Sequence, residues 1–286
     1  MIERLCIIGV GLIGGSLARA LREAGFCKEV VGSGRNPAHL QQAVELGVID
    51  RFDTDPARAV AGADMVLVAV PLGAMESVFS AVHGHLADDA VLTDAGSAKG
   101  SVLEAAQRAF GVLPGNFVPG HPIAGTEQSG VSASFAGLYR DRRVILTPTE
   151  MTDPEATARV RAMWEAAGAR VSEMTAVHHD AVLAATSHLP HVLAYTLVDS
   201  LARLGDHDEV FEYAAGGFRD FTRIASSDPV MWRDICLANG DAIELLIDRF
   251  IEDLRVLKGA VHVHDSDKLL AIFTSAKQAR DRHIGK

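Results

Sequence analysis

Short apolar runs separated by amphipathic stretches fill the first 173 residues of the chain. The apolar runs predict buried strands at residues 4–9, 29–33, 65–70, 90–94, 117–119, 144–147 and 170–173. Helical patterns lie between them at residues 37–46, 75–86 and 153–167. Strands that alternate with helices indicate a parallel sheet covered on both faces. We therefore predict a doubly wound α/β domain over residues 1–173.

The alternation stops after Met174, and residues 174–286 follow a helical pattern. Residues 179–204 are apolar almost all round, as expected of a helix enclosed by others. Nearer the end, apolar residues recur every three or four positions in one stripe, namely Ile243, Leu246, Ile247, Phe250, Ile251, Leu254 and Leu257. Such a stripe usually packs within its own chain, but this much apolar surface also fits a core shared between subunits. We predict an all-helical domain over 174–286 that forms a homodimer.

A glycine-rich turn follows the first predicted strand and opens the first predicted helix. Gly9, Gly11 and Gly14 form the GxGxxG pattern, in which they permit a tight turn, leave room for a pyrophosphate and allow close helix packing, respectively. The free N–H groups at the helix start, at Leu12 and Ile13, would bind the pyrophosphate. Glycine clusters also serve ordinary turns, but the order of strand, loop and helix favours dinucleotide binding.

The end of the second predicted strand is where such a site contacts the adenosine ribose. A site selective for NAD places an acid there, whereas this chain has Ser33, Gly34 and Arg35. No carboxylate repels a 2′-phosphate, and Ser33 and Arg35 can hydrogen-bond one, so the chemistry favours NADP, with NAD as the alternative. The alternative interpretation is that Arg35 is a solvated cation of the loop and does not bind the cofactor.

Composition narrows the classes of function. The 286 residues are 48% apolar, enough for a substantial core, and the net charge of −10 argues against a nucleic-acid or membrane surface. The chain has no run of 18 apolar residues and no signal-like start, so we expect a cytoplasmic protein. Cys6, Cys27 and Cys236 lie far apart and are expected to be reduced, without a metal.

Ligands of open α/β sheets bind beyond the carboxyl ends of the strands, so the loops there are candidate sites. Val70 and Pro71 lie at the end of the predicted strand 65–70 and would border the cofactor. Ser97, after the next strand, either offers a hydroxyl to a ligand or N-caps the following helix. Lys99 close by is interpreted as a surface cation of the first helical turn.

His121 follows the fifth predicted strand, between a glycine and a proline. An ordinary histidine pKa of about 6.5 lets the neutral ring accept a hydrogen bond near pH 7, which suits hydride chemistry. A lone histidine is more often structural, but this position at the ligand edge favours catalysis. Thr126 and Glu127 would orient the same loop, unless Glu127 is simply solvated.

Two further pairs stand out in the helical half. Arg219 and Arg223 are four residues apart, so on a helix they share a face and could clamp an anion, although the spacing alone is better explained by a solvated basic face balanced by Asp220. His188 and His191 are three apart, a spacing that suits a metal or a ligand. Because no third metal ligand is evident, we favour packing or hydrogen bonding to a substrate.

Together these motifs resemble one enzyme family. The segments GVGLIGGS, DAGSAKG, GHPIAGTE, SHLPH and FRDFTRIASSDPVMW occur in the order and spacing of the prephenate and arogenate dehydrogenases of tyrosine biosynthesis. The resemblance spans nearly the whole chain and implies a Rossmann-type domain followed by a helical dimerisation domain. It also implies that His121 binds the ring hydroxyl of the substrate with Ser97 nearby, that Arg223 binds a substrate carboxylate, and that His188 and His191 line the pocket.

The activity implied is oxidative decarboxylation of prephenate or arogenate with hydride transfer to NAD(P). Many members carry an acid where this chain has Gly34 and Arg35, and some have fused regulatory or mutase domains for which we expect no room before Lys286. A β-hydroxyacid dehydrogenase would share the architecture, but those enzymes use a lysine of the helical domain, which here is nearly free of lysine before Lys258. A non-catalytic NADP sensor would need neither His121 nor Arg223.

Overall fold

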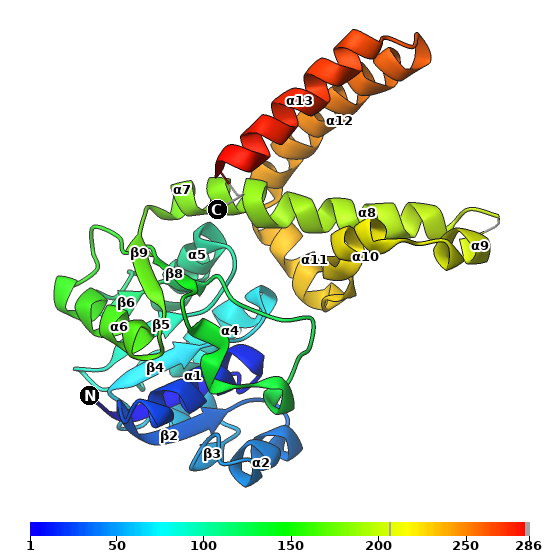
Figure 1. Ribbon diagram of the computed structural model, residues 1–286. Helices are drawn as coiled ribbons and strands as arrows, with labels where there is room; N and C mark the ends of the chain where they lie inside the picture. The colour runs from blue at the N-terminus through cyan, green and yellow to red at the C-terminus, as the bar shows by residue number, and fades with distance from the viewer. Residues whose placement is uncertain (206, 284–286) are drawn as a thin grey trace. The chain divides into compact units, whose positions relative to one another are not determined.

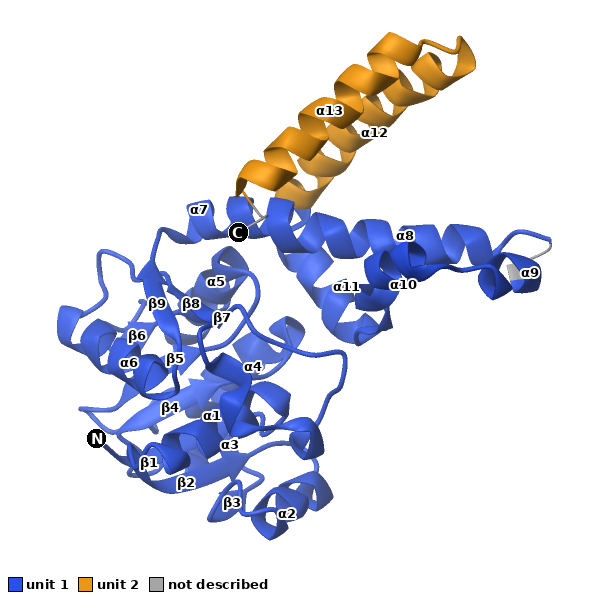
Figure 2. Cartoon of the chain, viewed as in Figure 1, with its two compact units in different colours: residues 1–240 blue, residues 241–286 orange. Residues whose placement is uncertain are grey.

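The computed structural model describes residues 1–205 and 207–283 (Figure 1). Its contacts divide the chain into two compact units, residues 1–240 and residues 241–286 (Figure 2). The first unit contains both β-sheets and the helices that surround them. The second consists of long helices, so each unit is described on its own.

A six-stranded parallel sheet forms the centre of the first unit, in the order β3-β2-β1-β4-β5-β6. Its strands are β1 (Ile2–Ile8), β2 (Cys27–Ser33), β3 (Arg51–Asp53), β4 (Met65–Val68), β5 (Val91–Asp94) and β6 (Phe117–Val118). The strand order reverses between β1 and β4, which creates the crevice where such sheets bind ligands. The predicted doubly wound α/β domain is confirmed.

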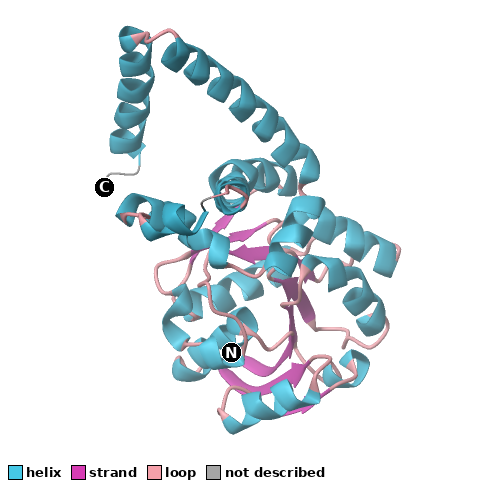
Figure 3. Ribbon diagram, turned by 90° about the vertical axis from the view of Figure 1, so that its right-hand side faces the viewer, coloured by secondary structure: helices cyan, strands magenta, loops and turns pink. Residues whose placement is uncertain are grey.

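Alternate residues of β1 face opposite layers of helices. Helices lie on both sides of the strands (Figure 3). Leu5 and Ile7 pack into a core with α1, α2 and α6, while Cys6 and Ile8 pack into a core with α3, α4 and α5. These helices are α1 (Leu12–Glu23), α2 (Pro37–Glu45), α3 (Pro56–Ala59), α4 (Met75–Val82), α5 (Lys99–Phe110) and α6 (Pro154–Ala166). β4 and β5 are buried along their whole length, as is β1 over residues 5–8, which explains their continuous apolar runs.

A second, three-stranded sheet departs from the prediction. β7 (Gly120–Pro122) pairs antiparallel with β8 (Arg143–Leu146), which pairs parallel with β9 (Arg170–Glu173). The sequence placed the last two strands in the main sheet and did not predict β3 or β7. Both missed strands have three residues, too few for a period of two to be visible. β7 follows β6 after one residue and so carries the chain from the first sheet into the second.

The rest of the first unit is helical. α7 (Ala176–Leu183), a π-helical turn (Ala184–His188) and α8 (Leu189–Ala202) follow one another without a break. They are followed by α9 (His207–Glu212), α10 (Gly216–Thr222), a 3-10 turn (Arg223–Ser226) and α11 (Pro229–Ala238).

The continuous helix from Ala176 to Ala202 has a mean hydropathy of 1.3 and by length and composition alone would suffice to cross a membrane. Only 22% of its apolar window is buried within the chain, and Ala194 is the one residue of α8 that is fully buried. The enclosure expected for residues 179–204 is therefore not provided by the described part of one chain.

The second unit contains α13 (Ser266–His283) and nearly all of α12 (Gly240–His262), joined by a short turn in which His264 has a φ of 55°. Of its described residues, Ile243 and Ala260 are buried, whereas large apolar side chains such as Leu245, Leu254 and Phe273 are exposed. In the apolar stripe predicted near the end of the chain, Ile243 is buried, Ile251 and Leu254 are exposed, and the other members are half-buried. Such a surface is typical of a protein–protein interface.

We expect the substitution Leu254→Glu to convert a dimer into monomers. Leu254 is 47% exposed in the single chain, so in a monomer the change would alter stability by at most about 0.5 kcal/mol, whereas a carboxylate buried in an interface costs several times more. Light scattering coupled to size-exclusion chromatography measures the mass. Lys258→Glu, an exposed polar position one turn further along α12, is the control, and a Leu254→Glu protein as dimeric as this control would contradict the expectation.

Candidate active site

The glycine turn after β1 has the geometry of a dinucleotide cradle. Gly9 has a φ of 99°, and a Cβ there would lie 2.3 Å from the carbonyl oxygen of Ala69. A Cβ on Gly14 would lie 2.5 Å from the carbonyl oxygen of Gly9. A Cβ on Gly11, by contrast, would have no atom within 4 Å. Two glycines are thus required by the packing of the protein itself, and the third leaves space open.

The open space at Gly11 adjoins the start of α1. Gly11 is the N-cap residue and no side chain caps this end, so the first amides of the helix, including those of Leu12 and Ile13, are available to an anion. Val70, just after β4, borders the same turn, because its Cγ1 is 3.1 Å from where a Cβ on Gly9 would be. Pro71 follows directly. These residues fit a bound nicotinamide dinucleotide.

The two predicted ribose-binding residues at the end of β2, Ser33 and Arg35, differ in their exposure to solvent. Ser33 is fully buried, and its hydroxyl has no hydrogen-bond partner within the described ranges. Arg35 is exposed in the loop that follows. Of the two, only Arg35 is therefore accessible to a phosphate in this structure.

The main chain around His121 is fixed by a buried ion pair. Lys99 Nζ lies 2.5 Å from Asp94 Oδ2, and neither side chain is exposed to solvent. The same ammonium donates to the Gly120 carbonyl oxygen at 2.7 Å, and the Gly120 amide donates to Asp94 Oδ1 at 3.0 Å. The interpretation of Lys99 as a surface cation is wrong. Its hydrogen bonds tie β5, the start of α5 and β7 together.

The imidazole of His121 is the first of three hydrogen-bonded side chains. His121 Nδ1 is 2.9 Å from His179 Nε2, and His179 Nδ1 is 2.7 Å from Asp180 Oδ1. His179 is fully buried on α7, and His121 is 9% exposed on β7. His179 and Asp180 were not predicted as site residues, because the helix that contains them is apolar over most of its length. The adjacent histidine and acid in that run were the available signal.

Electrostatics keep His121 uncharged. Burial, reinforced by His179, Lys99 and His188 nearby, holds the pKa of His121 well below its ordinary value of 6.5. The imidazole is thus neutral at physiological pH and has one nitrogen with a free lone pair. This is the state required of a hydrogen-bond acceptor.

Ser97 does not cap the helix that follows it. The N-cap residue of α5 is Ala98, and the first two amides of the helix, those of Lys99 and Gly100, each donate at 2.8 Å to the carboxylate of Asp180. Asp180 therefore caps α5 from another helix. The Ser97 side chain is partly exposed at the loop between β5 and α5, and its alternative role as a cap is not seen.

His188 and His191 make different contacts. His188 is buried, its Nδ1 lies 3.1 Å from Asn239 Nδ2, and its Nε2 has no partner within the described residues. Burial lowers the pKa of His188 to about 4, so this ring is also neutral. His191 stacks on the Trp232 ring at a centroid distance of 3.7 Å, and its Nδ1 lies 2.9 Å from the Ser187 carbonyl oxygen.

Arg223 and Glu127 come from distant parts of the sequence and form an ion pair. The side chains are 62% and 35% exposed, respectively. Arg219 is exposed on α10 and, within the described chain, shares no ion pair with them. Thr126 Oγ1 accepts a hydrogen bond from the Gln128 amide at 3.2 Å, which shapes the loop locally. The structure thus joins Arg223 to the His121 loop and does not join Arg219 to it.

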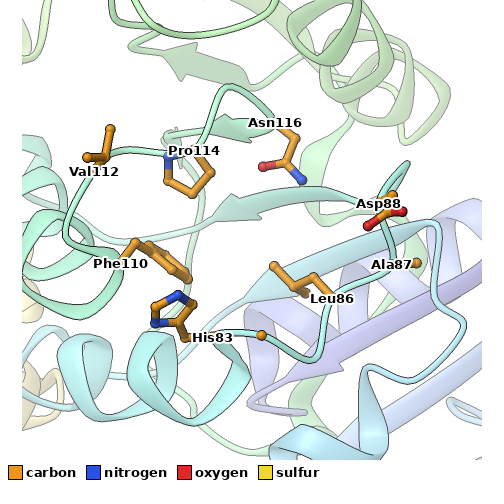
Figure 4. A pocket seen from close by; sticks show the side chains of 9 residues that line it. His83, Leu86, Ala87, Asp88, Phe110, Val112, Pro114 and Asn116 are labelled. Atoms are coloured by element: carbon orange, nitrogen blue, oxygen red, sulfur yellow. The ribbon is translucent and has the colours of Figure 1, made fainter.

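Two surface hollows lie away from this cluster or at its margin. One of about 350 Å³ is lined by residues such as His83, Phe110 and Asn116, which precede β5 and β6 and so mark the amino edge of the sheet (Figure 4). Ligands of this fold bind at the opposite edge. A second hollow of about 270 Å³, between α8 and α11, is bordered by Trp232 and Tyr195. It adjoins the ring on which His191 stacks.

Comparison with known proteins identifies the family of this chain. Residues 17–173 match the nucleotide-binding domain of prephenate dehydrogenase, and residues 175–275 match its dimerization domain. Cyclohexadienyl dehydrogenase of Zymomonas mobilis is 41% identical over 97% of this chain and 95% of its own length. Prephenate dehydrogenase of Bacillus subtilis is 35% identical over 98% of this chain and 76% of its own length.

A solved structure shows the same fold. The crystal structure of prephenate dehydrogenase from Aquifex aeolicus, in complex with hydroxyphenyl propionate and NAD+, is 37% identical and superposes with a TM-score of 0.91 over 99% of this chain and 98% of its own.

The glycine cradle and the neutral histidine define a dehydrogenase that uses a nicotinamide dinucleotide. The chain belongs to the prephenate and arogenate dehydrogenase family. This confirms the family predicted from the motifs, and it excludes the β-hydroxyacid dehydrogenase and the non-catalytic sensor. The match to a dimerization domain supports the predicted homodimer and accounts for the apolar helices left uncovered in one chain.

The cradle geometry predicts opposite effects for two glycine substitutions. Gly14→Ala places a methyl group against the main chain and should destabilise the fold by about 1–3 kcal/mol. Gly11→Ala meets open space and should change stability by less than about 1 kcal/mol, yet it should weaken NAD(P)H binding because the methyl group occupies the pyrophosphate position. Thermal unfolding and fluorescence titration separate the effects. Normal cofactor binding by Gly11→Ala would show that the pyrophosphate does not bind here.

Proposed function

We propose that this dehydrogenase catalyses the oxidative decarboxylation of prephenate, arogenate or both, giving 4-hydroxyphenylpyruvate or tyrosine. The observation that carries the proposal is the buried, neutral His121 held at the ligand edge of the sheet. A cyclohexadienol substrate needs a hydrogen-bond acceptor at its ring hydroxyl and a dry site for hydride transfer. The relatives named for these substrates support the same activity.

In the proposed reaction, His121 accepts the proton of the 4-hydroxyl as the C4–H bond breaks and a carbonyl forms. The dinucleotide, when bound, accepts the hydride at its nicotinamide ring. The bond between C1 and the ring carboxylate then breaks, carbon dioxide leaves, and its electron pair makes the ring aromatic. The phenolic oxygen takes back the proton from His121, so no proton is gained or lost overall.

Other residues bind and orient the substrate in this proposal. Arg223 binds a substrate carboxylate, which requires it to leave or share its present partner Glu127. His188 offers a buried, unpartnered Nε2, and His191 and Trp232 form an aromatic wall. Ser97, whose hydroxyl does not cap α5, lies at the same sheet edge as His121 and is the second hydroxyl-binding candidate.

Three finer points belong to the proposal. The cofactor is NADP, because Arg35 stands exposed where an NAD-selective site has an acid, with NAD as the alternative. The domains divide at residues 173 and 174, where the strands end and the helices begin. The cytoplasmic location expected from the sequence stays a prediction.

The direct test is to incubate the purified enzyme with prephenate or arogenate and with NAD+ or NADP+. The absorbance of the reduced nicotinamide reports hydride transfer, and chromatography identifies 4-hydroxyphenylpyruvate or tyrosine. Prephenate and arogenate differ only in a keto or amino group on the side chain, so both substrates are needed. No reduction with either substrate and either cofactor would refute the proposal.

His121→Asn should lower kcat by about 10²-fold or more with a modest change in KM, because the acceptor of the hydroxyl proton is lost. In the unmodified enzyme, kcat/KM should be independent of pH around 6.5 and fall only at more acidic pH, since the pKa of His121 is held well below 6.5 and the neutral, active form persists there. A pH profile with a midpoint at or above 6.5 would contradict the neutral-histidine mechanism.

Arg223→Ala should reduce kcat/KM by about 10- to 150-fold, mainly by raising KM, which corresponds to the roughly 1.5–3 kcal/mol of a hydrogen bond to a charged group. Arg219→Ala, at an exposed position four residues earlier, is the matched control and should cost at most about 0.5 kcal/mol. Cofactor affinity should be unchanged in both. Loss of cofactor binding in Arg223→Ala would indicate a structural role instead.

Arg35→Ala should weaken NADPH binding by about 10-fold or more and leave NADH binding nearly unchanged, because it removes a charge-assisted bond to the 2′-phosphate. Gly34→Asp should shift the preference towards NAD, and a Cβ at Gly34 meets only Leu40 at an ordinary 3.7 Å, so the variant should fold. Titration with both reduced cofactors measures the effect. An unmodified enzyme that already prefers NADH would show that this loop does not select NADP.

A further inference from the structure

Three side chains, two buried histidines and a partly buried aspartate, form a line that ends at a helix N-terminus. His121 Nδ1 lies 2.9 Å from His179 Nε2, and His179 Nδ1 lies 2.7 Å from Asp180 Oδ1. The Asp180 carboxylate also accepts hydrogen bonds from the amides of Lys99 and Gly100, each at 2.8 Å. We call His121, His179 and Asp180 the histidine relay.

The direction of each hydrogen bond follows from the end of the line. Burial raises the pKa of Asp180, but the hydrogen bonds from His179 and the two α5 amides outweigh it and hold the pKa below its ordinary value. An ionised carboxylate can only accept, so the proton of His179 is on Nδ1. In a neutral imidazole the other nitrogen is then an acceptor. His179 Nε2 therefore accepts from His121 Nδ1, and the lone pair of His121 is left on Nε2.

We propose that His179 and Asp180 are positioning residues that select the tautomer of His121 and so present its Nε2 as a hydrogen-bond acceptor to the substrate hydroxyl. This inference rests on the proposed function only for the identity of the substrate group. Without the relay, neutral His121 would distribute its proton between both nitrogens. The form with a proton on Nε2 would offer the hydroxyl a donor instead of an acceptor.

Protonation of the relay has a specific consequence. If His179 becomes a cation, its Nε2 donates to His121 Nδ1, and neutral His121 must then carry its proton on Nε2. A proton added at His179 thus removes the acceptor lone pair from His121 Nε2, although the net charge of His121 does not change. The charged or titratable groups that face this line are Lys99 on α5, Asp94 on β5 and His188 in the π turn.

The first experiment observes the tautomer without turnover. With 15N-labelled histidine in the full-length enzyme, the His121 signals, assigned by their loss in His121→Asn, should show the proton on Nδ1 and the lone pair on Nε2. A proton on Nε2 in the unmodified enzyme would overturn the relay. Because this measurement needs no substrate, an enzyme with the expected tautomer but no activity towards prephenate or arogenate would refute the proposed function and leave the relay intact.

The second experiment removes the orienting charge. Asp180→Asn keeps the shape but can donate to His179, so kcat should fall by about 10²-fold or more at unchanged KM, as when the orienting carboxylate of a serine-protease triad is replaced. The 15N signals should move towards the Nε2-protonated form. A purely structural cap would instead lower the melting temperature and leave both kcat at saturating substrate and the tautomer unchanged, which would overturn the proposal.

His179→Gln has a matched control in His178→Gln, because His178 is the preceding residue of α7 and is exposed. We expect His179→Gln to lower kcat and change the pH profile of kcat, whereas His178→Gln should resemble the unmodified enzyme. NADPH titration checks that each variant retains a folded cofactor site. Equal kcat and equal pH profiles for the two folded variants would show that His179 does not act on His121.

Discussion

Lys99 and Asp94 form an ion pair that is closed to solvent, and their remaining hydrogen bonds go to the main chain of the segments that build the site. Asp94 accepts from the amides of Gly96 and Gly120, and Lys99 donates to the Gly120 carbonyl. Burying two charges is costly unless they are paired and hydrogen-bonded, and here they pair with each other and with the main chain. The ion pair thereby fixes the relative positions of three segments. The turn after β5, the start of α5 and β7 are fixed against one another, so the backbone of His121 is held from the sheet side while His179 holds its ring from α7.

The parts of the fold that depend on local patterns could be predicted from the sequence. The glycine turn, five of the six strands of the parallel sheet and the helix starts with Asp or Asn before Pro all follow from neighbouring residues. The relay could not be predicted in this way, because His121 and His179 are 58 residues apart and meet only through the packing of α7 against α5. Lys99 was misjudged for the same reason. Its position in a first helical turn says nothing of the carboxylate and the carbonyl that surround it.

In the helical half, the apolar helix faces were predicted correctly, but the surface that covers them is not supplied by the same chain. Residues 179–204 and the stripe on α12 are as apolar as predicted, yet in a single copy most of these residues are half-buried or exposed. The apolar periodicity indicates that one face of a helix must be buried, but it does not indicate whether the same chain or a second subunit covers that face. The helix from Ala176 to Ala202 also satisfies a simple test for a membrane-spanning helix, and the match to a dimerization domain distinguishes the two environments.

The π turn at Ala184–His188 sets the rotational phase of the long helix. In an uninterrupted α-helix the nine steps from His179 to His188 would span about two and a half turns, which places the two side chains on opposite faces. The wider π turn reduces that rotation. Asn239 Nδ2 consequently reaches both the Asp180 carbonyl oxygen, at 2.9 Å, and His188 Nδ1. The number of residues in this stretch is therefore constrained independently of their identity, because losing one would preserve a helix but rotate the second half of the pocket away from the first.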